Sequence, residues 1–161
     1  MMRTIFIALF VFMCWVIPGK SQAQNFDKKA YYAILKSGKM ADVNEELDLI
    51  ASSSISEKEA YEGVLLMRKA ALQKIPVDKL KMFKKGRIKL ETAIANDNSN
   101  GEYRFLRLMI EENAPKIAKY HADLDTDKEH IKKSFKNLSP AVQQAIIDYS
   151  KNSKILQPQD F

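Results

Sequence analysis

Apolar residues recur at helical spacing along most of this sequence. After Ser56, for example, Tyr61, Val64, Leu65 and Leu72 follow one another at intervals that place them on one face of a helix. Alternating apolar and polar runs of strand length are absent, and five glycines and five prolines are too few for a protein built from many tight turns. The sequence therefore predicts an all-α fold of about six to seven helices in antiparallel hairpins, forming a single domain.

Breaking and capping residues predict the bounds of these helices. The expected ranges are 27–37, 40–51, 56–74, 77–95, 102–113, 126–136 and 140–152, followed by a frayed tail after Leu156. Gly38 is expected to end the first helix in a left-handed conformation. Ser56 with Glu59, and Thr126 with Glu129, have the spacing of a capping box at the start of a helix.

Two further features concern how the helices pack. Gly86 lies on the apolar stripe of its helix, where the missing side chain would let another helix approach closely. The pairs Ala30-Tyr31 and Ala60-Tyr61 recur thirty residues apart and hint at stacked hairpins of the tetratricopeptide kind. That architecture has a period near 34 residues with several matching positions, which this sequence lacks.

The first 23 residues have the three-part pattern of a secretory signal peptide. Arg3 supplies the positive end, an apolar run extends from Thr4 to Ile17, and small residues at Ser21 and Ala23 precede the expected cleavage site. A membrane anchor is the alternative, but a span takes roughly 20 apolar residues and this run is shorter. We therefore expect an exported protein, periplasmic or secreted, whose helical domain spans residues 24–161.

Loss of the signal peptide would limit the kinds of site that the domain can form and lower its net charge. It removes Cys14, the only cysteine, and with it disulfides, thiol nucleophiles and thiolate metal sites. It also removes Arg3 and Lys20, so the formal net charge of +6 falls to about +4, which does not indicate a nucleic-acid partner.

The first functional hypothesis is a binding module for a protein or peptide of the cell envelope. The segment 102–113 is dense in side chains that form directional bonds, and its candidate contact residues are Tyr103, Arg104, Arg107, Glu111 and Asn113. Arginine and tyrosine often anchor interfaces, although the same side chains also join helices to one another. Arg107 and Glu111 are spaced to pair along one helix face.

An enzyme receives less support from the sequence. No nucleophile elbow and no glycine-rich phosphate loop occur, so no cofactor is expected. The alternative is a metal-dependent enzyme whose ligands come from a cluster between two helices, namely His121, Asp123, Asp125, Asp127, Glu129 and His130. A calcium loop would need a glycine and a carboxylate where Lys128 and Ser134 stand. The other interpretation is a loop whose acids stabilise a helix N-terminus.

A second alternative is association with an anionic membrane surface. The helix expected over 77–95 is rich in basic residues, which are Lys79, Lys81, Lys84, Lys85, Arg87 and Lys89. A basic amphipathic helix can lie on such a membrane. A solvated outer face is the simpler interpretation, and the oligomeric state stays open.

Three stretches resemble a family of short exported helical proteins from Gram-negative bacteria. They are EAYEGVLLMRKAAL at 59–72, NGEYRFLRLMIEENAPKIAKYH at 100–121 and LSPAVQQAIIDYSKNSKIL at 138–156. The resemblance covers most of the chain after residue 23 and implies export and an all-helical fold. It carries no catalytic or binding residue, because that family has no assigned function.

Overall fold

The computed structural model describes residues 26–161, which form an all-α domain, as the apolar spacing predicts. The predicted signal peptide lies outside the described residues. Within this range no helix is long and apolar enough to cross a bilayer. The seven α-helices are α1 (Lys28–Ser37), α2 (Met40–Ser52), α3 (Lys58–Leu72), α4 (Pro76–Asn96), α5 (Gly101–Asn113), α6 (Leu124–Ser134) and α7 (Pro140–Ser150). Three short 3-10 helices join them, η1 (Lys116–Ala118), η2 (Phe135–Asn137) and η3 (Pro158–Asp160).

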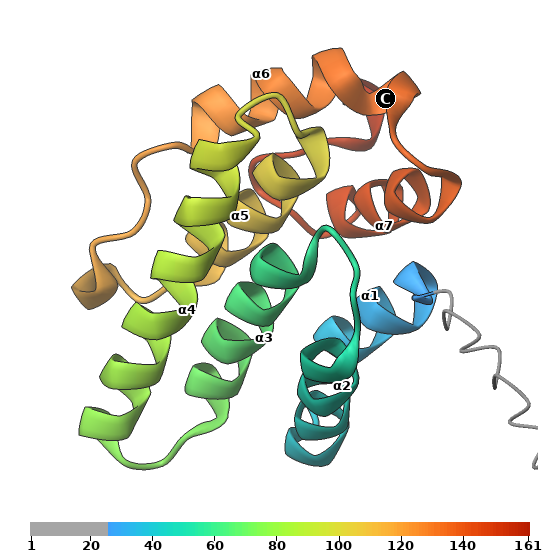
Figure 1. Ribbon diagram of the computed structural model, residues 1–161. Coiled ribbons are helices and arrows are strands. Elements are labelled where there is room, and N and C mark those ends of the chain that lie inside the picture. Colours follow the sequence, from blue (N-terminus) through green and yellow to red (C-terminus); the bar gives the residue numbers. More distant parts are fainter. Residues whose placement is uncertain (1–25) are drawn as a thin grey trace, which may run out of the picture.

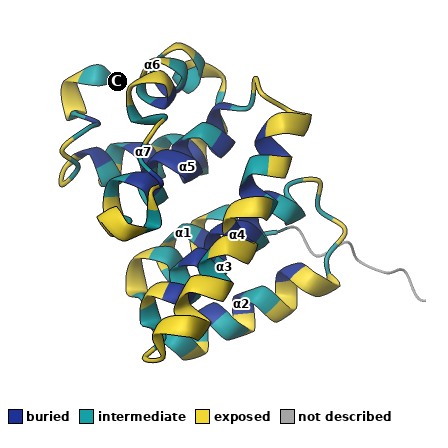
Figure 2. Ribbon diagram, turned by 90° about the vertical axis from the view of Figure 1, so that its left-hand side faces the viewer, coloured by how far each residue is buried: buried dark blue, intermediate teal, exposed yellow. Residues whose placement is uncertain are grey.

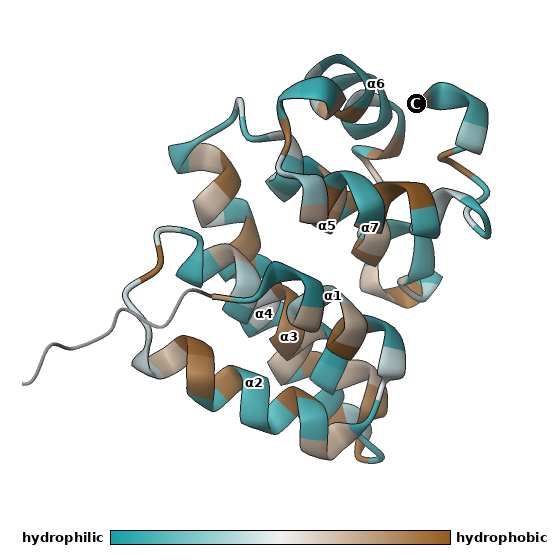
Figure 3. Ribbon diagram, turned by 90° about the vertical axis from the view of Figure 1, so that its right-hand side faces the viewer, coloured by the Kyte–Doolittle hydropathy of each residue, from teal (hydrophilic) through white to brown (hydrophobic). Residues whose placement is uncertain are grey.

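The helices pack as hairpins on either side of α5 (Figure 1). α3 and α4 form the most extensive hairpin, and α2 packs against α3. On the other side, α6 packs against α5, while α7 lies next to α1 (Figure 3). The chain thus returns its last helix to its first.

Two hydrophobic clusters share α5. The first joins α1 to α5 and includes Tyr31, Tyr61 and Leu106, whereas the second joins α5 to α6 and α7 and includes Phe105 and Leu108. Neighbouring residues of α5 therefore point into different clusters, and the helix is buried along most of its length (Figure 2). Each fully buried apolar side chain contributes about 1.5–3 kcal/mol.

The predicted caps meet a mixed outcome. Gly38 ends α1 at φ 63°, and its N–H donates to the Ile34 carbonyl, as expected. Neither capping box forms. The Ser56 hydroxyl donates to the Glu57 carboxylate at 2.8 Å instead, and α6 begins two residues before Thr126.

The chain after Leu156 is ordered against the domain, so the prediction of a frayed tail is wrong. Leu156 is fully buried in the second cluster. Asp160 forms ion pairs with Lys128 and Lys132, both at 3.3 Å, and Phe161 packs on Phe135 with ring centroids 4.7 Å apart. The apolar contact and the two ion pairs together hold the end of the chain.

The predicted close approach at Gly86 is confirmed, and Gly63 of α3 is its counterpart. A Cβ at Gly63 would lie 2.7 Å from the Gly86 carbonyl oxygen and 2.8 Å from the Leu90 nitrogen. A Cβ at Gly86 would lie 2.9 Å from the Met67 nitrogen. Real Cβ atoms do not come this close, so the two glycines bring the backbones of α3 and α4 into contact.

We predict that Gly86→Ala lowers stability. In an unconstrained helix interior this exchange gains about 1 kcal/mol, whereas here the added methyl group overpacks the α3–α4 contact and is expected to cost about 1–3 kcal/mol. Urea unfolding followed by circular dichroism measures the difference. The control is the same exchange at exposed Thr92, comparing Thr92→Gly with Thr92→Ala, where alanine should be the more stable; a gain at both positions would contradict the prediction.

Candidate functional site

The predicted contact residues of α5 do not form one surface. Tyr103, Arg107 and Glu111 are buried, with 7%, 4% and 0% of their surface exposed, so they cannot serve as a solvent-facing contact patch. Arg104 is partly buried, and Asn113 is exposed at the end of the helix. Burial at these positions has a physical cause, because α5 is covered by other helices on most sides.

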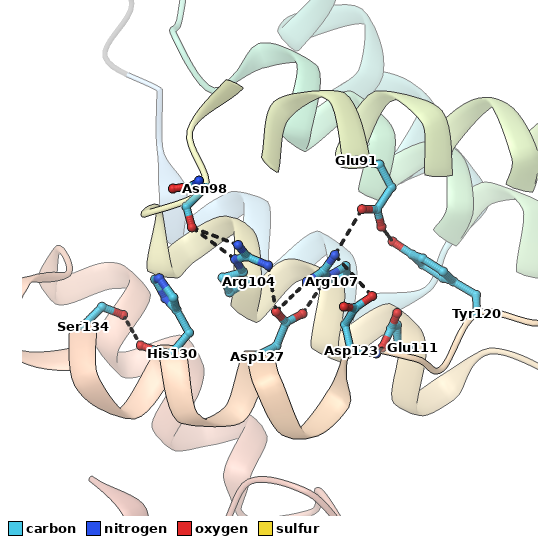
Figure 4. Close-up of polar contacts among 10 residues, drawn as sticks. All are labelled: Glu91, Asn98, Arg104, Arg107, Glu111, Tyr120, Asp123, Asp127, His130 and Ser134. Atoms are coloured by element: carbon cyan, nitrogen blue, oxygen red, sulfur yellow. Dashed lines mark hydrogen bonds and ion pairs between the residues drawn. The ribbon is translucent and has the colours of Figure 1, made fainter. Parts of the chain in front are cut away.

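Arg107 lies instead at the centre of an ion-pair network between α4, α5 and α6 (Figure 4). Its Nε and Nη2 each donate to one carboxylate oxygen of Asp127 at 2.7 Å, which is a bidentate pair. Its Nη1 donates to Glu91 at 3.1 Å and lies 3.4 Å from Asp123. Burial opposes the charge of Arg107, but the hydrogen bonds to Asp127 and the charges of Asp127, Glu91 and Asp123 together outweigh it and raise the pKa of the guanidinium.

Arg104 extends the network to the loop before α5. Its Nη1 lies 3.3 Å from Asp127, and its Nε and Nη2 donate to the carbonyl of Asn98 (Figure 4). Two arginines therefore satisfy the fully buried Asp127. The network joins helices, and both oxygens of that carboxylate accept hydrogen bonds from arginine.

Glu111 does not pair with Arg107 as its helical spacing predicts, because Arg107 turns toward α6. One Glu111 oxygen accepts the backbone N–H of Asp123 at 3.1 Å, and the other is buried without a hydrogen-bond partner. Burial raises the pKa of this carboxyl above its ordinary value. Glu111 thus secures the turn into α6.

The residues of the predicted metal cluster do not converge on a common point. Asp127 is occupied by the arginines, whereas Asp125 is exposed on the first turn of α6. His121 and His130 each have one buried ring nitrogen without a hydrogen-bond partner. Between residues 26 and 161, no group of three or more histidine, cysteine or acidic side chains is placed to hold a metal ion.

A groove of about 660 Å³ lies between α1, α3, α5 and α7. Its walls are mostly apolar, and Asn113 is the one predicted contact residue that lines it. The other lining residues are Lys29, Tyr32, Ala33, Leu35, Lys36, Val64, Arg68, Met109, Ile110, Ala141, Gln144, Ala145, Asp148, Tyr149 and Asn152. Four helices distant in sequence build this groove, so no local pattern indicated it.

Arg68 is the partly buried cation of the groove. Its guanidinium packs over Gly38, in the space that a Cβ of that residue would occupy. The Arg68 Nε is buried without a hydrogen-bond partner, and no acidic side chain of the described residues pairs with the guanidinium. The signal for this residue in the sequence is an arginine set among the apolar positions of a helix.

The charges around the groove are mainly positive. Lys29 and Lys36 of α1 line it and are exposed. The acid that lines it, Asp148, pairs with Lys151 at 2.6 Å. The groove therefore offers an apolar surface with an excess of positive charge.

A buried carboxylate at Glu102 positions the α1 wall of the groove. It accepts hydrogen bonds from Tyr32 at 2.9 Å and Tyr61 at 2.7 Å and pairs with Lys28 at 2.7 Å. Burial and the charge of Glu102 raise the pKa of the Tyr61 phenol, which stays protonated and donates its hydrogen. These bonds hold α1 against α3 and α5.

Comparison of the chain with protein-family models, with curated proteins and with solved structures finds no match. The interpretation of the groove and of the ion-pair network therefore depends on the geometry of this structure alone.

We predict that Asp127→Ala destabilises the domain by about 3–5 kcal/mol, because Arg107 is left buried without its bidentate partner and Arg104 loses an ion pair. The matched control is Asp125→Ala in the same turn of α6, where an exposed acid contributes only about 0.3–1 kcal/mol through the helix dipole. Thermal and urea unfolding compare the two variants. Equal losses would contradict a central role for the Arg107–Asp127 pair.

Proposed function

We propose that this protein is an exported, non-catalytic binding module whose groove between α1, α3, α5 and α7 takes a peptide segment of an envelope protein. The segment carries a carboxylate flanked by apolar residues. The observation that carries this proposal is the unpaired guanidinium of Arg68 within an apolar groove.

Arg68 favours an anionic group for two reasons. Arg68 is partly buried and its buried Nε has no hydrogen-bond partner, so an acceptor supplied by a ligand would satisfy this donor. The planar fork of arginine also matches a carboxylate with two parallel hydrogen bonds. In the free protein, the carbonyl end of α1 beside Gly38 offsets part of the charge.

The size and lining of the groove favour a short peptide. Its volume falls within the range of about 300–1,000 Å³ that ligand pockets span. Leu35, Met109 and Ile110 are partly exposed and offer apolar contact, and Lys29 and Lys36 add attraction for an acidic segment. Such a site combines an apolar anchor with one charged contact.

Export is supported by the pattern of residues 1–23 and by where the domain starts. Cleavage after Ala23 would leave a few residues before α1, which begins at Lys28. The first helix would then stay intact in the processed protein.

We predict that peptides selected from a random displayed library on this protein share an acidic residue flanked by apolar ones. Arg68→Gln should lower the affinity for a selected peptide by about tenfold or more, because a hydrogen bond to a charged group contributes about 1.5–3 kcal/mol. Isothermal titration measures the affinity, and thermal unfolding confirms that the variant folds. Arg87→Gln, on exposed α4, serves as the control and should bind normally. Peptides without an acid, or binding indifferent to Arg68, would overturn the proposal.

We also predict that the chain expressed in a Gram-negative host is recovered from the periplasm with Gln24 at its N-terminus. Ala23→Lys should block this processing, because the cleavage site requires a small residue there, whereas Gln22→Lys between the two recognition positions should be tolerated. Intact mass spectrometry distinguishes the forms. A chain that keeps residues 1–23 in the cytoplasm would disprove export.

A further inference from the structure

Exposed aliphatic side chains gather around α4. Among the described residues, six large apolar side chains are exposed, and five lie on α4, just before it or on the neighbouring η1 segment. They are Ile75, Val77, Leu80, Ile88 and Ile117, exposed by 48–89%. The sixth, Leu49, lies on α2, so the concentration near α4 is specific to that side of the molecule.

The outer side of α4 is also strongly basic. Val77, Lys81, Lys84 and Ile88 follow one another at intervals of four, three and four residues, which places them along one side of the helix. Lys85 lies beside this line, whereas Lys79 is exposed on the other side of the helix near its start, and the exposed residues run along the outward side of α4 in Figure 2. No ion pair within residues 26–161 involves these four lysines.

Few acids oppose this charge. Asp78 is the one carboxylate in residues 74–89. Of the acids that approach from other elements, Glu62 of α3 pairs with Lys89 at 2.9 Å. Glu91, farther along α4, pairs with Arg107. The charges of the lysines on the outer side are therefore not neutralised by ion pairs and can attract an anionic partner.

The η1 segment extends the same side of the molecule. Tyr120 fastens it to α4, since its ring meets Phe83 edge-on at 5.9 Å and the Arg87 guanidinium stacks over it at 4.5 Å. Ile117 is exposed by 89%, and Lys116 and Lys119 beside it are exposed as well. Aliphatic and basic side chains thus alternate over both elements.

We propose that this basic apolar face, formed by Ile75, Val77, Leu80, Lys81, Lys84, Ile88 and Ile117, docks on an anionic phospholipid bilayer. The lysines attract the headgroups, and the branched aliphatic side chains enter the boundary between headgroups and acyl chains. The exposed aliphatic residues favour a lipid partner over a nucleic acid, because the phosphate backbone of a nucleic acid would offer them no apolar contact. Docking leaves the helix parallel to the surface.

A tryptophan reporter tests contact with the acyl region. The chain has one tryptophan, Trp15, so the domain 26–161, which holds both hydrophobic clusters, has none of its own. Ile88→Trp places a fluorophore on the basic apolar face, and Leu49→Trp places a matched one on α2, beside Glu45 and Asp48. Circular dichroism first confirms that both variants fold.

Vesicles of equal phosphatidylglycerol and phosphatidylcholine should shift the emission of the Ile88→Trp variant to the blue and leave that of the Leu49→Trp variant unchanged. Vesicles of phosphatidylcholine alone should shift neither. Raising the salt concentration should weaken the binding, because screening acts on exposed charges. A shift in both variants, or in neither, would overturn the proposal.

Neutralising two lysines tests the electrostatic part. In the Ile88→Trp background, Lys81→Gln with Lys84→Gln should reduce vesicle binding roughly thirty-fold, because each lysine near an anionic surface contributes about 1 kcal/mol. Lys133→Gln with Lys136→Gln, exposed on α6 and η2, is the matched control and should bind normally. Equal losses in both pairs would mean attraction by net charge alone and would contradict a defined docking face.

Discussion

The charged side chains buried on α5 constrain the placement of the surrounding helices. Glu102, Arg107 and Glu111 lie on a helix that is covered on most sides, where a charge without a partner is strongly destabilising. Each finds its partners on other elements: Glu102 on α1 and α3, Arg107 on α4 and α6, and Glu111 at the start of α6. A shift of α1, α3, α4 or α6 relative to α5 would break one of these contacts.

Such pairs specify an arrangement more than they add stability. Replacing a whole buried ion pair by apolar side chains is often neutral or stabilising, whereas removing one partner costs several kcal/mol. The stabilising free energy of this domain comes mainly from the two hydrophobic clusters that meet at α5. The polar contacts select one packing among the several that similar apolar stripes would allow.

Local signals in the sequence predicted the helices well and their polar partners poorly. Helical spacing, the left-handed cap at Gly38 and the close approach at Gly86 depend on residues a few positions apart. The pairing of Arg107 with Asp127 joins residues twenty positions apart and wins over the local spacing to Glu111, because it makes two short bonds. The residues of the groove show the same difference between local and long-range signals. The sequence pointed to Asn113 as a contact residue, whereas Arg68 comes to line the groove only because α1 and Gly38 fold over it.

The glycine contact between α3 and α4 has a mechanical consequence. α3 lines the groove through Val64 and Arg68, and through Gly63 it holds α4 backbone to backbone. Because no side chains lie between the two backbones at this contact, α3 and α4 have little freedom to move relative to each other. The hairpin therefore behaves as a rigid unit. The outer side of α4 and the opening of the groove therefore keep a constant orientation relative to each other. A ligand bound in the groove would be held at a fixed orientation to a surface bound by α4.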